Sequence, residues 1–245
     1  MFEFGPATYG DRIAGVYDTW YSIPQDTDDT VAFLAPLAQG KSALELGIGS
    51  GRIALPLAAR GMNVSGIDAS EAMLEKLREK PGSEVVATYL GDFADVDVTG
   101  RFELIFAAFN TFFALASQDE QIRCFQNVAQ RLDPGGAFVI EAFVPDLSRY
   151  SGNQDLATKA IEANLVVLDA AVHDPVTQTI SVQHVVIGEW GVQLYPVLLR
   201  YAWPGELDLM ARLAGLRLRD RWSGWLNEPF TAQSQKHVSV YTKDL

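Results

Sequence analysis

Between residues 42 and 141 the chain alternates short apolar runs with longer amphipathic stretches of helical spacing. The apolar runs cover residues 42–46, 63–67, 84–88, 103–107 and 137–141. The amphipathic stretches cover residues 51–60, 70–80 and 118–131. Uninterrupted apolar runs are typical of parallel strands that are buried on both faces and alternate with helices. The pattern predicts an α/β fold with a doubly wound, mostly parallel sheet.

The segments before and within this alternation carry two local predictions. Residues 7–38 are amphipathic at helical spacing, with an interruption at Pro24 and a second helix expected from Asp28 to Leu37. Pro56 falls inside the first amphipathic stretch of the alternating region. Because a proline in a helix interior removes a backbone hydrogen bond, a bend is expected near this residue.

The pattern changes again after Pro145. Three further apolar stretches are joined by short connections, so they are expected to be antiparallel strands. These stretches are residues 165–172, 179–187 and 193–203. A helix and two more strands are then predicted at residues 204–214, 216–222 and 237–242. With the five earlier runs, the last two strands bring the main sheet to seven.

The most informative stretch lies where the first predicted strand gives way to a helix. It reads Glu45-Leu46-Gly47-Ile48-Gly49-Ser50-Gly51-Arg52, with a glycine at every second position after Glu45. Glycines let the chain turn sharply and leave no Cβ between the backbone amides and a bound molecule. The start of a helix adds amide donors and the positive end of a dipole. The stretch therefore predicts a ligand held close to bare backbone.

Acidic residues at two neighbouring strand ends favour a nucleotide as that ligand. Asp68 ends the second predicted strand, where a carboxylate can accept both hydroxyls of a ribose. Gly91-Asp92-Phe93 follows the third strand and suits an adenine ring with its amino group. An NAD-dependent oxidoreductase is one alternative, but the dinucleotide fingerprint needs a third glycine where this chain has Arg52.

These motifs resemble those of the class I S-adenosylmethionine-dependent methyltransferases. Glu45-x-Gly47-x-Gly49-x-Gly51 matches the first motif of that family, Asp68 its ribose-binding acid, and Gly91-Asp92 its adenine-side acid. Residues 131–136 are similar to the segment that the family places before its fifth strand. The resemblance implies a Rossmann-like fold and S-adenosylmethionine as the cofactor.

The resemblance also implies roles for individual residues. Glu45 would organise the glycine loop and the methionyl amino end, Asp92 and Phe93 would face adenine, and residues 106–112 would lie where cofactor and acceptor meet. Tyrosines 9, 17 and 21 resemble the aromatic lid of small-molecule members, particularly amino-sugar N-methyltransferases. The residues expected to bind the cofactor are Tyr17, Tyr21, Glu45, Gly47, Gly49, Gly51, Arg52, Asp68, Ala69, Met73, Gly91, Asp92, Phe93, Phe109 and Asn110.

The expected architecture follows from the pattern and the resemblance together. It is a seven-stranded, mostly parallel Rossmann-like sheet with an N-terminal helical lid and an antiparallel β insertion after the fifth strand. The lid would be residues 1–39, the cofactor-binding core residues 40–144 and 204–245, and the insertion residues 145–203. Similar proteins often pair subunits through such an insertion, so it is expected to line the substrate cleft or to form a homodimer.

Charge and composition narrow the choice of partners. The formal net charge of −12 would repel nucleic acid, and no block of Lys and Arg offsets it locally. The fourth strand is not followed by Asn-Pro-Pro-Tyr or Asp-Pro-Pro-Tyr, so a small-molecule acceptor is expected. No carboxylate cluster for magnesium is recognisable, so no metal is expected. Without a leader sequence or about 18 consecutive apolar residues, a cytoplasmic protein with no membrane partner is expected.

The histidines are candidates for a general base, because imidazole titrates near neutral pH. His184 in the insertion and His237 at the start of the last strand are the catalytic candidates, with a hydrogen-bonded structural residue as the alternative for each. His173 beside a turn is expected to be solvated. Cys124 is expected to be an inert packed thiol. Two alternatives remain for four of the tryptophans: they line an acceptor pocket, or they pack in the core or in an interface. These residues are Trp190, Trp203, Trp222 and Trp225.

The leading hypothesis is methyl transfer from S-adenosylmethionine to an oxygen or nitrogen of a small metabolite by direct in-line displacement. In such a reaction positioning and desolvation can supply much of the rate gain. A catalytically silent cofactor-binding protein is the other alternative. A cavity beside residues 109–112 would favour the enzyme.

Overall fold

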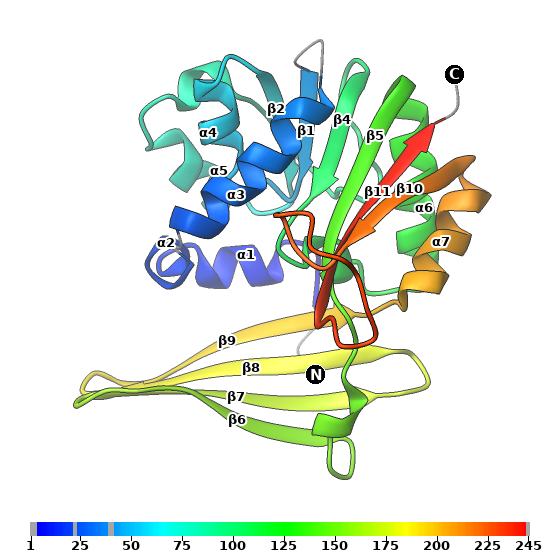
Figure 1. Cartoon of the computed structure of the whole chain (residues 1–245). Helices are drawn as coiled ribbons and strands as arrows, with labels where there is room; N and C mark the ends of the chain where they lie inside the picture. The colour runs from blue at the N-terminus through cyan, green and yellow to red at the C-terminus, as the bar shows by residue number, and fades with distance from the viewer. Residues whose placement is uncertain (1–3, 22–23, 39–41, 244–245) are drawn as a thin grey trace.

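Figure 1 shows the computed structural model, which describes residues 4–21, 24–38 and 42–243. A seven-stranded sheet forms its centre, and a separate four-stranded sheet lies below it in this view. The strands of the larger sheet, in spatial order, are β10 (Leu216–Trp222), β11 (Lys236–Lys243), β5 (Leu132–Phe143), β4 (Phe102–Ala107), β1 (Ser42–Leu46), β2 (Asn63–Asp68) and β3 (Ala87–Leu90). All neighbours pair in parallel except β11, which runs antiparallel to both β10 and β5. This is the predicted Rossmann-like sheet.

Helices cover the larger sheet on both faces. In β4, Ile105 packs into one buried cluster and the next residue, Phe106, packs into the other. The first cluster contains side chains of α6 (Gln118–Arg131) and α7 (Pro204–Leu213). The second contains side chains of α3 (Pro24–Leu34), α4 (Ala54–Ala59) and α5 (Glu71–Arg78). Because consecutive strand residues point to opposite faces, a wholly apolar strand needs a packed layer on each side.

The smaller sheet is an antiparallel meander inserted after β5. Its strands, in order, are β6 (Gln154–Ile161), β7 (Leu165–Asp174), β8 (Thr179–Gly188) and β9 (Gly191–Arg200). A 3-10 turn, η4 (Leu147–Arg149), leads into it. The sequence predicted three of these strands and missed β6. This edge strand has no fully buried residue, so no apolar run marks it in the sequence.

Short helices at the N-terminus lie between the two sheets (Figure 1). They are α1 (Thr8–Ile13) and α2 (Tyr17–Trp20), whereas α3, which a 3-10 turn, η1 (Ala35–Leu37), extends, packs on a face of the larger sheet. Pro24 begins α3 instead of interrupting a helix, because proline suits the first helical position. Ile13 of α1 packs with Met73 of α5 and with Val186 and Tyr195 of the insertion. The predicted boundary between residues 39 and 40 lies outside the described residues.

Two local predictions in the core were wrong. No bend arises at Pro56, because α4 begins at Ala54 and places Pro56 in its first turn, where amides have no intrahelical acceptor. The third strand is β3, shifted beyond the predicted residues 84–88 by a 3-10 turn, η2 (Ser83–Val85), that follows the left-handed Gly82. None of the helices within the described ranges is long and apolar enough to cross a membrane.

Gly66 in β2 is expected to tolerate no side chain. A Cβ at this position would lie 2.2 Å from Cδ1 and 2.5 Å from Cβ of Ile48 in the glycine loop. The Gly66→Ala substitution should lower the free energy of unfolding by about 1–3 kcal/mol through overpacking, as measured by urea denaturation. Gly205→Ala is the control, because nothing lies within 4 Å of its added Cβ. Equal stability of the two variants would contradict the tight packing of Gly66.

Candidate active site

A cavity of about 300 Å³ opens at the carboxyl edge of the larger sheet. Ligands of doubly wound folds bind in the crevice at this edge. The ends of β1, β2 and β4 form one wall, and the N-terminal helices and β9 form the others. The lining residues are Pro6, Tyr9, Gly10, Tyr17, Tyr21, Gly47, Gly49, Asp68, Ala69, Met73, Phe93, Phe109, Asn110, Thr111, Ala114, His184, Val197, Leu198 and Leu199. Most of the residues expected to bind the cofactor are among them.

The glycine loop folds tightly against the end of β2. The N–H groups of Gly47 and Ile48 donate to the carbonyl oxygen of Ile67 at 2.8 and 3.1 Å. Gly47 has a φ of 67° and Gly49 a φ of 54°, which side chains disfavour. A Cβ on Gly47 would lie 2.4 Å from Cγ2 of Thr111. Both the turn and the close approach of the segment after β4 therefore require bare backbone here.

Asp68 fastens this loop to the end of β2. Its Oδ2 accepts the N–H of Gly49 at 2.8 Å, and its Oδ1 accepts the N–H of Ser70 at 2.9 Å. Burial raises the pKa of Asp68, and the two amide donors oppose that rise. A carboxylate oxygen has two lone pairs, so acceptor capacity is left for the hydroxyls of a ribose in the cavity.

Glu45 lies at the end of β1, just behind the glycine loop. It is buried, and its Oε2 has no hydrogen-bond partner among the described residues. Burial raises the pKa of Glu45 to about 8, while the positive charge of Arg52 opposes the rise. An unpartnered buried carboxylate oxygen needs a donor, and the amino group of a bound S-adenosylmethionine is one that fits.

A strained turn follows β4 and lines the same cavity. Phe109 has a φ of 57° and Asn110 a φ of 64°, two left-handed residues in succession. Such a φ is uncommon for any residue but glycine and is an outlier for a bulky one. The N–H of Phe109 donates to Glu141 Oε2 at 2.7 Å, and Asn110 Oδ1 accepts the N–H of Phe143 at 2.7 Å. β5 therefore holds the turn through a side chain and a backbone amide.

The tyrosines that resemble an aromatic lid line the cavity on the side of α1 and α2. The ring centroids of Tyr17 and Tyr21 are 4.8 Å apart, and those of Tyr21 and Phe109 are 5.0 Å apart. The hydroxyl of Tyr9 donates to that of Tyr21 at 3.4 Å. Burial raises the pKa of Tyr17 to about 12, so this phenol stays neutral at ordinary pH.

Short polar contacts dock the N-terminal helices on the rim of the cavity. The hydroxyl of Ser70 donates to Asp11 at 2.6 Å, and that of Ser50 donates to Asp18 at 2.6 Å. Gly10 lies so close to the start of α5 that an added Cβ would be 2.5 Å from Cβ of Ser70. The helices therefore rest directly on the glycine loop and on the residues after Asp68.

A second cavity, of about 750 Å³, adjoins the first. The inner face of the insertion lines it, together with residues after β5 and residues 232–235. The two cavities share Asn110, His184, Val197 and Leu199. A molecule in the second cavity would therefore meet a molecule in the first beside His184 and Asn110.

His184 stands at this junction with a carboxylate behind it. Its Nδ1 hydrogen-bonds Oδ1 of Asp169, whose Oδ2 lies 3.1 Å from Nζ of Lys159. Burial alone would raise the pKa of Asp169, but the hydrogen bonds and charges of His184 and Lys159 lower it. Asp169 is therefore ionised at neutral pH and fixes the orientation of the imidazole ring. Within the described part of the chain, Nε2 of His184 has no hydrogen-bond partner.

The other two histidines are structural. His237 is fully buried in β11, and its Nδ1 lies 2.8 Å from Oγ of Ser239. It lines neither cavity, and burial lowers its pKa to about 3, which favours the structural alternative for this residue over a general base. His173 was expected to be solvated, but it is buried and hydrogen-bonded to the hydroxyl of Tyr201 at 2.9 Å. The sheets bury these rings, which sequence position did not reveal.

Several residues expected to bind the cofactor lie outside the lining. They are Glu45, Gly51, Arg52, Gly91 and Asp92. A Cβ on Gly51 would lie 3.0 Å from Leu77, so this glycine serves the packing of the loop. The guanidinium of Arg52 lies 5.1 Å from the ring centroid of Phe109, directly behind the cavity wall. Asp92 accepts a hydrogen bond from the N–H two residues later, which shapes the turn after β3.

Some lining residues were missed in the sequence. Pro6, Gly10, Ala114 and residues 197–199 belong to no motif, and residues 197–199 come from a strand far along the chain. None of the four predicted tryptophan candidates lines either cavity, and Trp190 and Trp203 are exposed. Trp225, by contrast, is buried with its ring centroid 5.3 Å from that of Phe33. Cys124 is buried and burial raises its pKa, which agrees with an inert thiol.

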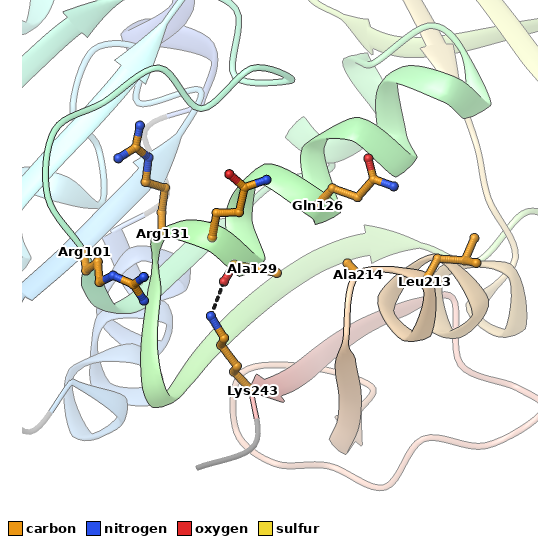
Figure 2. A pocket seen from close by; sticks show the side chains of 8 residues that line it. Arg101, Gln126, Ala129, Arg131, Leu213, Ala214 and Lys243 are labelled. Atoms are coloured by element: carbon orange, nitrogen blue, oxygen red, sulfur yellow. Dashed lines mark hydrogen bonds between the residues drawn. The ribbon is translucent and has the colours of Figure 1, made fainter.

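Figure 2 shows a hollow at the opposite, amino edge of β4 and β5, where α6 ends. Its cationic side chains are Arg101, Arg131 and Lys243. Lys243 Nζ donates to the carbonyl oxygen of Ala129 at 2.6 Å, and Arg101 donates to that of Leu132 at 3.2 Å. These cations satisfy carbonyl groups at the C-terminal end of α6. Two of the three cations that line the hollow therefore cap this helix.

Comparisons with known proteins identify the family of the chain. The family described as a methyltransferase domain matches residues 43–136. The structure of the CcbJ methyltransferase from Streptomyces caelestis is 43% identical, with a TM-score of 0.93, and the match covers 99% of this chain and 100% of that one. The chain belongs to the S-adenosylmethionine-dependent methyltransferases.

Two further proteins are similar to this methyltransferase over almost their whole length. The cypemycin N-terminal methyltransferase of a Streptomyces species is 29% identical, over 96% of this chain and 97% of its own length. CalS10, an amino pentose methyltransferase from Micromonospora echinaspora solved with S-adenosylmethionine bound, is 20% identical with a TM-score of 0.70 and shares the fold over 99% of this chain and 98% of its own. The family match and the similarity to the CcbJ methyltransferase set aside the nicotinamide and non-catalytic alternatives.

Asp68 in this methyltransferase can be tested by cofactor binding. Asp68→Asn should weaken binding of S-adenosylhomocysteine by about 1–3 kcal/mol, because charge-assisted hydrogen bonds to the ribose are lost. Isothermal titration calorimetry measures the change, and the thermal midpoint checks that the variant is folded. Equal affinity in the two proteins would show that Asp68 does not contact the ribose.

The buried carboxyl of Glu45 should make stability depend on pH. With a native pKa of about 8, above its ordinary value, the folded chain keeps a proton that the unfolded chain releases. The free energy of unfolding should therefore fall between about pH 5 and pH 8, by at most about 1.4 kcal/mol per pH unit. The Glu45→Gln variant should lack this decline. The free energy of unfolding is measured by urea denaturation at several pH values in that range. The same pH dependence in the wild type and in Glu45→Gln would refute the assignment.

Proposed function

We propose that the enzyme transfers the methyl group of S-adenosylmethionine to an amine nitrogen of a small molecule, and that His184 receives the proton released. The observation that carries the proposal is the meeting of two cavities beside His184. The first cavity would hold the cofactor and the second the acceptor. The lid of residues 1–39 and the insertion of residues 145–203 would close this space over the core.

The cofactor would lie across the glycine loop. Asp68 would accept the ribose hydroxyls, Phe93 would pack on adenine, and Glu45 would accept from the methionyl amino group. The left-handed turn at Phe109 and Asn110 would face the sulfonium. This placement is supported by the free acceptor capacity of Asp68 and by the unpartnered oxygen of Glu45. It also accounts for the bare backbone at Gly47 and Gly49.

The chemical step is an in-line displacement. The nitrogen lone pair forms a bond to the methyl carbon while the carbon–sulfur bond breaks, and its electrons stay on sulfur as S-adenosylhomocysteine leaves. Because a bound ammonium has no lone pair, it would give up one proton before this attack, and Nε2 of His184 would accept that proton. Asp169 would stabilise the resulting imidazolium, because it is ionised and bonded to the other ring nitrogen. Exclusion of water by the aromatic lid would favour the step.

Nitrogen is favoured over oxygen as the target by one relative and by charge. The cypemycin N-terminal methyltransferase, matched over almost the whole chain, is named for an N-terminal acceptor. The chain's net charge of −12 would attract a cationic ammonium and repel an anion. A hydroxyl acceptor would use the same geometry, so the experiment must separate the two.

A pH profile of His184 variants tests the proposal. A panel of amino sugars, amino-acid amides and short peptides, each with a matched hydroxyl compound, is screened for release of S-adenosylhomocysteine. With an amine acceptor, His184→Asn should lower turnover by roughly 10²-fold at pH 7 and recover much of it near pH 10, where solvent deprotonates the ammonium. Methylation confined to hydroxyl compounds would overturn the nitrogen assignment.

Two controls accompany the profile. Binding of S-adenosylhomocysteine should be nearly unchanged in His184→Asn, because the residue is assigned to the acceptor and not to the cofactor. Asp169→Asn should follow the same pH trend with a smaller loss, since it removes only the support behind the ring. If His184→Asn turned over at the wild-type rate at every pH, His184 would not be the general base.

A further inference from the structure

The left-handed turn at Phe109 and Asn110 is held by a buried carboxylate that belongs to no motif. We infer that Glu141 is a positioning residue: it keeps this turn in its strained conformation and, through Lys236, links the turn to the N-terminal helix α3. The inference goes beyond the proposed function and does not depend on which acceptor binds. It concerns the wall that the turn contributes to the cofactor cavity.

The first support is the strain of the turn, together with the hydrogen bonds that hold it. Two successive left-handed residues, one of them a phenylalanine, persist only where surrounding contacts determine them. The amide of Phe109 donates to Oε2 of Glu141 at 2.7 Å, and the amide of Asn110 donates to the backbone oxygen of Glu141 at 3.2 Å. Glu141 therefore accepts from both strained residues. Hydrogen bonds to a charged acceptor are among the stronger ones.

The second support is the cation that faces the other carboxylate oxygen. Lys236 Nζ lies 3.0 Å from Oε1 of Glu141, whose side chain is buried, and 4.0 Å from Oδ1 of Asp26 in α3. Burial alone would lower the pKa of Lys236, but the charge of Glu141 outweighs it and raises the pKa. The ammonium of Lys236 therefore faces one oxygen of Glu141, while the other oxygen accepts from Phe109. Lys236 at the start of β11 thus bridges the turn and the N-terminal helices.

A second set of contacts connects α3 to the ring of Phe109 through Arg52. Asp26 Oδ2 lies 3.3 Å from a guanidinium nitrogen of Arg52, and that guanidinium lies 5.1 Å from the centroid of the Phe109 ring. Phe109 is therefore held through its backbone by Glu141 and Lys236, and through its ring by Arg52. Lys236 and Arg52 both face Asp26 of α3. Docking of α3 and the shape of the cofactor cavity are coupled by this arrangement.

Hydrogen exchange and cofactor binding test the role of Glu141. Glu141→Ala removes the hydrogen bond that the N–H of Phe109 donates to the side chain of Glu141. The amide of Phe109 should therefore exchange about tenfold faster or more, and the Kd for S-adenosylhomocysteine should rise about tenfold. Glu141→Gln keeps a neutral acceptor, so both effects should be smaller. Exchange is read by NMR or by mass spectrometry of peptides that contain residue 109, without cofactor or acceptor.

Glu206→Gln is the matched control. Glu206 is a largely buried carboxylate, 2.7 Å from a guanidinium nitrogen of Arg200, and it lines neither cavity. This variant should lower the melting temperature while Phe109 exchange and the Kd for S-adenosylhomocysteine stay at wild-type values. A merely structural role for Glu141 would give the same result in Glu141→Ala, with a lower melting temperature and nothing else, and would overturn the inference.

A further variant covers the case in which Glu141→Ala does not fold. Lys236→Met leaves the Glu141–Phe109 bond in place but removes the cation beside it, so exchange at Phe109 should rise several-fold. Wild-type exchange at Phe109 in both Lys236→Met and Glu141→Gln would overturn the inference. Failure of the proposed nitrogen methylation would change none of these readouts, so the two proposals are tested separately.

Discussion

The hydrogen bonds that Asp68 accepts from the N–H groups of Gly49 and Ser70 join three pieces of chain at one carboxylate. They tie the loop after β1 to the end of β2 and to the start of α5. The N-terminal helices then dock on this joined surface through Ser50 and Ser70. A single partly buried acid therefore fixes the backbone that a cofactor would contact and the surface on which the N-terminal helices dock.

The second sheet adds a second cavity beside the first. Its inner face lines the larger cavity, and β8 places His184 where the two cavities meet. The carboxylate behind the imidazole comes from the neighbouring strand β7, at the position paired with His184 in the ladder. Strand register thus sets the side-chain pair, because residues opposite each other in an antiparallel ladder share one face. In the proposed mechanism, activation of the acceptor depends on that register.

Sequence patterns predicted the core well because its rules are local. Runs buried on both faces mark β1, β2, β4 and β5, and the glycine loop marks the sharp turn after β1. The predictions that the structure does not favour concern elements whose character depends on distant partners. β6 is an edge strand with little burial, Pro56 lies in a first turn, and His237 is enclosed by strands that are separate in sequence. Local periodicity carries no signal for any of them.

By itself, the sequence determined the fold class, the glycine loop, Asp68 and the cofactor, because bare backbone and a strand-end acid need only local chain geometry. Tertiary structure alone decided which histidine faces the cavities, which residues of β9 line them, and that Glu141 supports the turn at Phe109. Those facts depend on contacts between segments far apart in the chain. Residues 141 and 109, for example, are brought together by the pairing of β4 with β5 and not by spacing along the sequence.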